Sequence, residues 1–174
     1  VAAADKAGRV DELSDPNADL TVFAPTDAAF TALATSLGFA DANAMVTALD
    51  GPTLAKILTF HVLPTNESAA ELVAGGATQG TLYSLTPGTP ATLAVDTASG
   101  VKLTDAALNQ ASVTSADVAA SNGVIHVIDK VLVPPGVLNV VQMAQSNPVF
   151  SVLVEAVVAA DLAGALSGAG PFTV

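Results

Sequence analysis

Cysteine and tryptophan are absent from this 174-residue sequence, and tyrosine occurs once, at Tyr83. The lack of cysteine excludes a disulfide framework, thiol catalysis and cysteine-ligated zinc. Aromatic residues make up only 4% of the chain, although 51% of it is hydrophobic and its mean hydropathy is +0.58. We therefore expect a core of many small apolar side chains, in one domain of ordinary size and part of another.

Basic residues are also scarce, because five Lys and Arg stand against 16 Asp and Glu, for a formal net charge of −11. A surface this acidic repels phosphate groups, so we expect neither nucleic acid nor an anionic membrane as a partner. Solubility, or adaptation to a salty environment, accounts for the charge. Cation-mediated contact is the alternative that remains open.

Residues suited to catalysis are few. His61 and His126 are the only imidazoles, and no Gly-x-Ser-x-Gly elbow supplies a nucleophilic serine. The HExxH, calcium-loop and phosphate-binding glycine patterns are missing as well. Each histidine lies in an apolar strand pattern, which favours a hydrogen-bonded core residue, and we expect Asp27 to be the structural partner of His61. We predict no catalytic residue, no metal site and no cofactor.

The spacing of apolar residues predicts mainly helices before residue 78 and mainly strands after it. Thr26 and Asp27 are N-cap types, and Phe30 opens an apolar face with helical spacing. The expected helices are 1–13, 28–37, 41–49, 52–58, 68–74 and 149–166. The expected strands are 21–23, 60–63, 81–85, 91–95, 101–104, 111–118 and 124–133.

Three blocks resemble the conserved boxes of one known family. They read Leu-Thr-Val-Phe-Ala-Pro-Thr-Asp-Ala-Ala-Phe over 20–30, Leu-Thr-Phe-His-Val-Leu-Pro over 58–64, and Asn-Gly-Val-Ile-His-Val-Ile-Asp-Lys-Val-Leu-Val-Pro-Pro over 122–135. In order and spacing they resemble the first homology box, the Tyr-His box and the second homology box of the fasciclin-like (FAS1) domain. The resemblance covers 1–135. It implies an α+β fold, a seven-stranded antiparallel β-wedge of two sheets surrounded by several α-helices.

The resemblance assigns family-motif residues to this chain, which we interpret as structural because most are apolar. Phe60 stands where the family usually has tyrosine, so any contact through that hydroxyl is lost. The Asp-Ile type of integrin-recognition motif found in animal members of the family is not evident in this sequence. We therefore do not expect this chain to bind integrins. The motif residues are Thr21, Phe23, Pro25, Thr26, Asp27, Phe30, Phe60, His61, Val124, Ile125, His126, Val127, Ile128 and Asp129.

The segment 136–174 looks like a linker followed by the opening of a second module. Ala-Ala-Asp-Leu-Ala-Gly over 159–164 echoes 3–8, and Gly-Pro-Phe-Thr-Val over 170–174 echoes 18–22. The expected helix 149–166 is apolar nearly all round but shorter than the roughly 20 residues of a membrane span. Such a helix must be buried, either back on the first module or on a neighbouring chain. Both arrangements stay open.

The opening residues carry no basic signal-peptide region, and we expect that an earlier segment was removed or never included. The resemblance implies a non-enzymatic, secreted or cell-surface adhesion module, used in tandem for cell-surface, matrix or biofilm contacts with other proteins or surface glycans. Asn66 fits a glycosylation acceptor pattern in an expected loop. Two alternatives remain open: a filament subunit that self-associates through 137–174, and a carrier of an apolar ligand such as a carotenoid.

Overall fold

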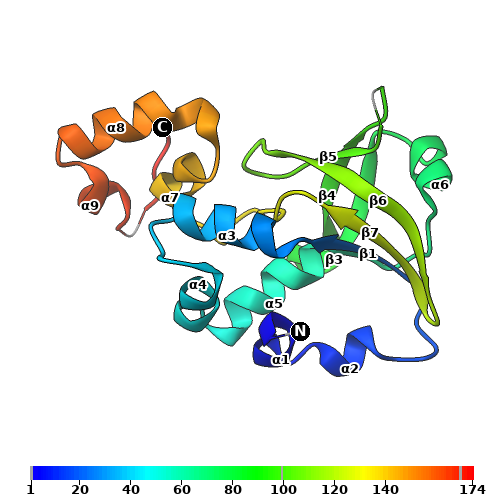
Figure 1. Ribbon diagram of the computed structural model, residues 1–174. Coiled ribbons are helices and arrows are strands. Elements are labelled where there is room, and N and C mark those ends of the chain that lie inside the picture. Colours follow the sequence, from blue (N-terminus) through cyan, green and yellow to red (C-terminus); the bar gives the residue numbers. More distant parts are fainter. Residues whose placement is uncertain (1, 99, 169) are drawn as a thin grey trace.

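The structure is a computed structural model that describes residues 2–98, 100–168 and 170–174. It has the expected α+β architecture, in which helices surround a wedge of strands (Figure 1). The strands are β1 (Leu20–Pro25), β2 (Val62–Leu63), β3 (Thr78–Thr86), β4 (Thr89–Asp96), β5 (Lys102–Thr104), β6 (Gln110–Ala120) and β7 (Gly123–Ile128). The α-helices are α1 (Ala2–Ala7), α2 (Val10–Leu13), α3 (Asp27–Ser36), α4 (Ala42–Ala48), α5 (Gly51–Phe60), α6 (Ala69–Ala74), α7 (Val140–Gln145), α8 (Ser151–Ala159) and α9 (Ala163–Leu166), with a 3₁₀ turn η1 at Pro148–Phe150.

The strands follow the order β2-β1-β7-β6-β5-β4-β3 and form two sheets joined by the long strand β6. The first residues of β6 pair with β5, and the rest of β6 pairs with β7. At the far edges β2 contacts β3, so the sheets close towards a barrel. This confirms the expected wedge of two sheets.

One pair of strands differs from the expected antiparallel arrangement. β1 and β7 are parallel, with Val22 opposite Ile125 and Ala24 opposite Val127. These strands lie about a hundred residues apart in the chain, so no hairpin fixes their relative direction. Both are central strands and bring the first and second homology boxes side by side.

Two expected strands are shorter in the structure. Phe60 ends helix α5 and His61 caps it, so the strand expected over 60–63 is only Val62–Leu63. The strand expected over 124–133 ends at Ile128, although Val131 and its neighbours remain buried. An apolar run therefore indicates burial here without fixing a strand, because a loop can also be buried once side chains satisfy its backbone.

Helices α3 to α7 each begin at a polar side chain, and Thr26 is one of the two N-cap types named from the sequence. Thr26, Asp41 and Asp50 each accept a hydrogen bond from a backbone N–H in the first turn of α3, α4 and α5. Ser68 and Glu71 form a capping box at α6, and Asn139 and Gln142 form another at α7.

Most of the core lies inside the wedge. Its buried members come from both sheets, from α5 and α6, and from the segment after β7: Phe23, Phe60, Leu63, Leu72, Tyr83, Leu93, Val95, Leu103, Ala111, Ile128 and Leu132. The Phe60 and Tyr83 rings meet edge to face, with centroids 6.2 Å apart. A smaller cluster of Ala29, Ile57 and Val131 attaches α3 and α5 to the segment after β7.

Candidate functional site: two buried histidines and two apolar surfaces

His61 ties helix α5 to the segment after β7. Its Nδ1 lies 2.7 Å from the carbonyl oxygen of Ile57, and the Leu132 N–H donates to its Nε2 at 2.9 Å. The ring is therefore neutral, with its proton on Nδ1. Burial lowers the pKa of His61 to about 4, and the hydrogen bond to Ile57 opposes this only in part. Both partners are backbone groups, so the expectation that Asp27 would partner His61 was wrong.

His126 occupies the equivalent role on strand β7. The Asp117 N–H donates to its Nδ1 at 3.2 Å, and its Nε2 lies 2.9 Å from the carbonyl oxygen of Glu67. Its ring stacks on Phe23 with centroids 5.7 Å apart. Both nitrogens of each histidine are thus occupied by backbone groups, which leaves neither ring available as a general base.

The other motif residues also hold segments of the chain together. The Thr21 hydroxyl donates to the Thr65 carbonyl at 2.6 Å and accepts the Glu67 N–H at 2.8 Å. Asp129 accepts the Ser112 N–H at 2.7 Å. The buried motif residues are Thr21, Phe23, Phe60, His61, Val124, His126 and Ile128; Pro25, Thr26, Phe30, Ile125 and Val127 are partly buried, and Asp27 and Asp129 are exposed.

Sequence reasoning missed Asp105, a buried carboxylate in the turn between β5 and β6. Its Oδ1 accepts the N–H groups of Ala107 and Asn109, and its Oδ2 accepts the N–H of Val133. Burial raises the pKa of Asp105, and these three backbone hydrogen bonds work in the opposite direction. Aspartate commonly bonds to backbone N–H groups two residues on, so the Asp-Ala-Ala-Leu-Asn turn carried the signal that could have found it.

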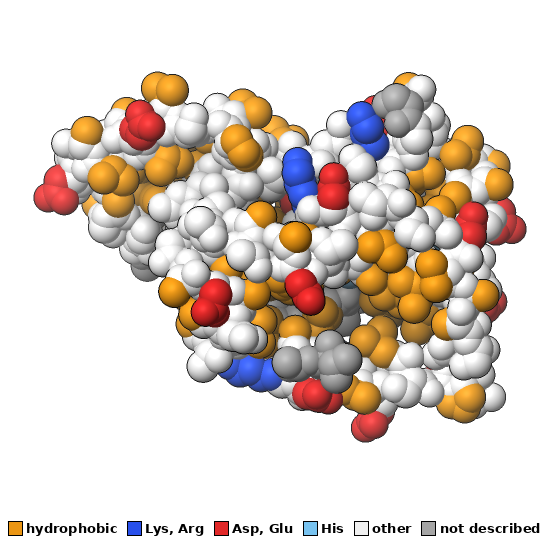
Figure 2. Space-filling view, in the orientation of Figure 1, with side chains coloured by type: hydrophobic (Ala, Val, Ile, Leu, Met, Phe, Trp, Pro, Cys, Tyr) orange, Lys and Arg blue, Asp and Glu red, His pale blue; other side chains and the backbone are white. Residues whose placement is uncertain are grey.

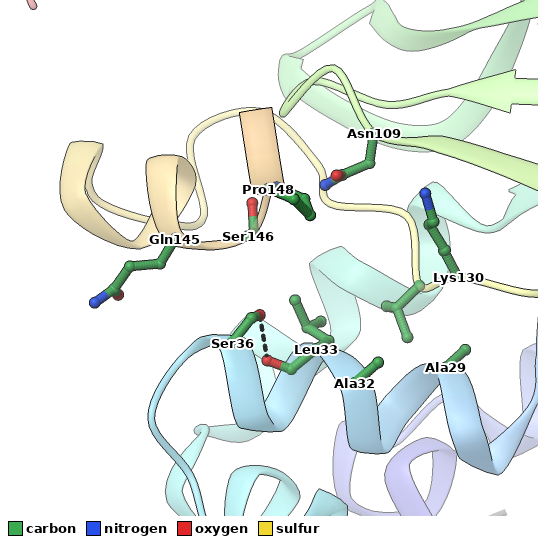
Figure 3. A pocket seen from close by; sticks show the side chains of 10 residues that line it. Ala29, Ala32, Leu33, Ser36, Asn109, Lys130, Gln145, Ser146 and Pro148 are labelled. Carbon is green, nitrogen blue, oxygen red and sulfur yellow. Dashed lines mark hydrogen bonds between the residues drawn. The ribbon is translucent and has the colours of Figure 1, made fainter. Parts of the chain in front are cut away.

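A small pocket with a mostly apolar lining and a few polar side chains lies between α3 and the chain around η1 (Figure 3). Its volume is about 170 Å³, and Figure 3 shows Asn109 and Lys130 directed towards it while Gln145 points away. No carboxylate is among the described residues that line it. The Ser36 and Ser146 hydroxyls donate to backbone carbonyl oxygens of their own helices, at 2.8 Å each. An ammonium group without an acid or a general base beside it does not form a catalytic arrangement.

A larger apolar groove follows the outer face of β1 and β7, and we call it the β1/β7 groove. It consists of two adjoining cavities of about 240 and 210 Å³ that share Leu13 and Val22. The sheet side presents the partly buried residues Leu20, Val22 and Ile125, and helices α1, α2 and α5 form its rim. Its lining is almost entirely apolar, so it offers contact area and no reactive group.

The segment from η1 through α8 to the residue before α9 carries a second exposed apolar surface, which we call the α8 surface: Val149, Val152, Leu153, Val158 and Leu162. The side chains of Val149 and Val152 are 82% and 75% exposed. None of the residues of α8 is buried, so this chain by itself does not provide the burial expected for that helix. Figure 2 shows apolar side chains gathered over this lobe, at the upper left.

The backbone of α8 and α9 repeats that of α1 and α2. Gly8 and Asp161 both have positive φ, +65° and +57°, and each is followed two residues later by a four-residue helix, α2 or α9. Asp161 also breaks the helix expected over 149–166. In this repeat of backbone geometry, Gly8 corresponds to Asp161. The sequence echo of 3–8 in 159–164 places Gly8 opposite Gly164 instead, three positions later.

Metal and membrane-spanning features do not appear in the described part of the chain. Within 2–98, 100–168 and 170–174 no group of three or more His, Cys, Asp or Glu side chains is placed to hold a metal ion. None of the helices described there is long and apolar enough to cross a membrane.

Comparison with known proteins agrees with the three boxes. The family model described as the Fasciclin domain matches residues 1–134. Protein sll1483 of Synechocystis sp. is 38% identical over 134 residues, which is 76% of this chain and 65% of that protein. Protein sll1735 of the same organism is 36% identical over 138 residues, 76% of this chain and 85% of that protein.

A solved structure of a FAS1 domain pair, from the insect cell adhesion molecule fasciclin I, has a similar fold. It matches with a TM-score of 0.57 and 21% identity, over 96% of this chain and 54% of that one. The chain thus spans about half of that structure and just under two thirds of sll1483. The three boxes, the wedge of two sheets and the family match together show that the chain belongs to the fasciclin domain family.

Proposed function

We propose that this chain is a non-enzymatic adhesion module that acts outside the cell, at a cell surface, in a matrix or in a biofilm. Fasciclin domains are adhesion-type interaction modules, and they typically occur in extracellular or cell-surface proteins. The observation that carries the proposal is the complete use of both histidines by backbone groups. The polar side chains of the three boxes make hydrogen bonds that stabilise the fold. We therefore expect the residues that bind a partner to lie in exposed loops.

In the exposed loops of this fold, backbone polar groups and small side chains are accessible to a protein or glycan partner. The loop from Pro64 to Asn66 and the turn at Pro87 and Gly88 are exposed. Asn66 is accessible in the first of these loops, and its glycosylation stays a prediction. Neither loop contributes a side chain to the buried core, so each can change without loss of the fold.

Adhesion of coated beads tests this proposal. Beads that carry the chain should bind one another, or surfaces coated with matrix proteins and glycans, more strongly than beads that carry an unrelated acidic protein. Loop variants such as Asn66→Ala or a replaced Pro87–Gly88 turn should lower binding while the circular dichroism spectrum stays unchanged. Binding no stronger than that of the acidic control on every surface would contradict an adhesive role.

The segment 136–174 is, we infer, the opening of a second fasciclin module. The family model ends at 134, whereas the match to the domain pair covers 96% of this chain. The repeat of α1–α2 geometry in α8–α9 supports the same division. Tandem use would present two similar surfaces on one chain and raise the effective concentration of the second contact.

Carriage of an apolar ligand such as a carotenoid has one observation in its favour, the β1/β7 groove. Its cavities of about 240 and 210 Å³ are smaller than the roughly 300–1,000 Å³ of typical small-molecule sites. A long polyene would therefore extend beyond each cavity. The visible absorption spectrum of protein purified from its natural source tests this alternative, since a carotenoid carrier would be coloured.

A further inference from the structure

We propose that Asn122, in the turn between β6 and β7, is a site of spontaneous deamidation, and that this reaction detaches residues 13–19 from the turn. Asn122 and Gly123 form the one Asn-Gly pair among the seven asparagines of the sequence. The reaction needs no partner and no enzyme. It therefore goes beyond the adhesion proposed above and stands or falls separately.

The fold requires the side-chain amide of Asn122. Its nitrogen donates to the carbonyl oxygens of Leu13 and Asp15, at 3.0 Å each, and its backbone carbonyl oxygen accepts the Leu20 N–H at 3.1 Å. Two carbonyl acceptors need a group with two N–H donors, whereas a carboxylate only accepts hydrogen bonds. Asn122 therefore joins residues 13–20 to the β6–β7 turn.

The fold also requires glycine at position 123. Gly123 has φ of +148°, and a Cβ there would collide with the backbone of Leu20. A glycine has no side chain to shield its backbone nitrogen, and such a nitrogen attacks the side chain of a preceding asparagine most readily. The two structural requirements together place a chemically labile pair in this turn.

The reaction is balanced with water as its only co-reactant. The Gly123 nitrogen attacks Cγ of Asn122 and forms a new N–C bond, the Cγ–Nδ2 bond breaks, and ammonia leaves with the proton of the Gly123 N–H. Water then opens the cyclic imide. Cleavage of its bond to Cγ gives aspartate, and cleavage of its bond to the main-chain carbonyl carbon gives isoaspartate, which lengthens the backbone by one carbon.

Both products are incompatible with the contacts of the intact turn. Aspartate at 122 would present carboxylate oxygens to the Leu13 and Asp15 carbonyl oxygens, which now accept from the amide. It would also add a negative charge to a chain whose formal charge is already −11. Isoaspartate would displace Gly123, which already lies against the backbone of Leu20. Either product therefore releases residues 13–19.

The intact turn protects the amide that it uses. Loss of the nitrogen as ammonia breaks both hydrogen bonds of the Asn122 side chain, and Gly123 is paired with Ala120 at the end of the β6–β7 hairpin. The reaction therefore follows local opening of the turn. Reclosing cannot restore an amide that has been lost, so the converted fraction grows with the age of the protein.

Cleavage by hydroxylamine tests the site on the unmodified chain. Hydroxylamine traps the cyclic imide and cuts the chain after residue 122, which gives fragments 1–122 and 123–174. We expect cleavage in urea, and cleavage at least about tenfold slower in native buffer. Equal rates under the two conditions would overturn protection by the turn, and an uncut chain in urea would overturn the site itself.

Peptide mapping by mass spectrometry identifies the product in stored protein. In mildly alkaline buffer prepared with heavy-oxygen water, residue 122 should take up one heavy oxygen. Uptake should be faster at urea concentrations that leave the wedge folded, because urea favours local opening. Conversion of the exposed Asn66 without any label at residue 122 would overturn the proposal.

Two aspartate variants test the consequence of the reaction. Asn122→Asp should speed hydrogen exchange across residues 13–19 by about tenfold, because it replaces a donor to two carbonyl groups by an acceptor. Asn43→Asp is the matched control, since Asn43 is exposed on α4 and the substitution adds the same charge outside the turn. Protein converted at residue 122 during storage gives the same measurement without a substitution. Unchanged exchange across residues 13–19 in the converted protein would refute the proposed detachment.

Discussion

The wedge and the segment 136–174 have similarly apolar sequences but very different burial. Within the described residues before 136, large side chains such as Phe23, Phe60 and Leu103 are fully buried. Among the described residues after 135, Val141 and Asn147 alone are buried. The difference shows that apolar composition does not create a core by itself. The wedge has two sheet faces that close on each other, whereas α7, α8 and α9, as far as the structure describes the chain, pack mainly on one another.

Truncation of one apolar side chain in each region gives the largest expected contrast. Phe23→Ala should lower the free energy of unfolding by about 3–5 kcal/mol, because it leaves a cavity beneath His126. Val152→Ala should change it by less than about 0.5 kcal/mol, because the side chain is 75% exposed. Urea denaturation followed by circular dichroism measures both. Similar losses for the two variants would show that α8 is buried in solution.

Replacing a glycine by alanine should also cost stability in the wedge and not in the segment 136–174. Gly123 has φ of +148°, and a Cβ there would collide with the backbone carbonyl of Leu20, so Gly123→Ala should cost roughly 2–4 kcal/mol. Gly164 lies in α9 with open space around it, so Gly164→Ala should be neutral or slightly stabilising. Thermal unfolding midpoints of the two variants test this. A destabilised Gly164→Ala protein would contradict the open surroundings of α9.

Mild acid should weaken the wedge through His61. Its pKa is about 4 in the folded state and about 6.5 when unfolded, so the unfolded chain binds the extra proton between these values. Stability is therefore complete above pH 6.5 and falls by up to about 3 kcal/mol as the pH drops towards 4. Denaturation at several pH values should show this loss, and His61→Gln should flatten it.

Asp105 acts in the opposite direction over part of this range. Because burial raises its pKa, the folded state takes up a proton before the unfolded chain does, which adds stability as the pH falls. Asp105 is present in both the original chain and the His61→Gln protein. Subtracting one profile of unfolding free energy against pH from the other therefore cancels the contribution of Asp105 and leaves that of His61. Parallel profiles would mean that His61 is not the group responsible.

The capping boxes should give the smallest contrast. Ser68→Ala removes the cap of α6, which is packed into the wedge through Leu72, and should cost about 1 kcal/mol of global stability. Asn139→Ala removes the equivalent cap of α7 and should loosen only the segment after 138. Hydrogen exchange resolves the two effects. Faster exchange across the whole wedge in Asn139→Ala would show that both regions unfold together.

Much of the fold could be read from particular residues. Thr26, Asp41 and Ser68 announce helix starts through their own side chains, and the turns between strands follow from Gly and Pro. The β1–β7 pairing could not be read in this way, because it joins residues about a hundred positions apart. The Leu132 N–H that donates to His61 was missed for the same reason, since it comes near the ring only after the chain has closed.

The sequence by itself determined the family, the helix starts, the shortage of catalytic groups and the acidic charge, because these depend on residue types and short-range order. The tertiary structure alone decided that β1 runs parallel to β7, that backbone groups occupy both nitrogens of each histidine, and that Asp105 is a buried anchor. It also decided that α8 stays exposed while a groove of similar character opens on the far side of the molecule. Burial and hydrogen-bond partnership depend on which distant segments meet, and local sequence does not specify that meeting.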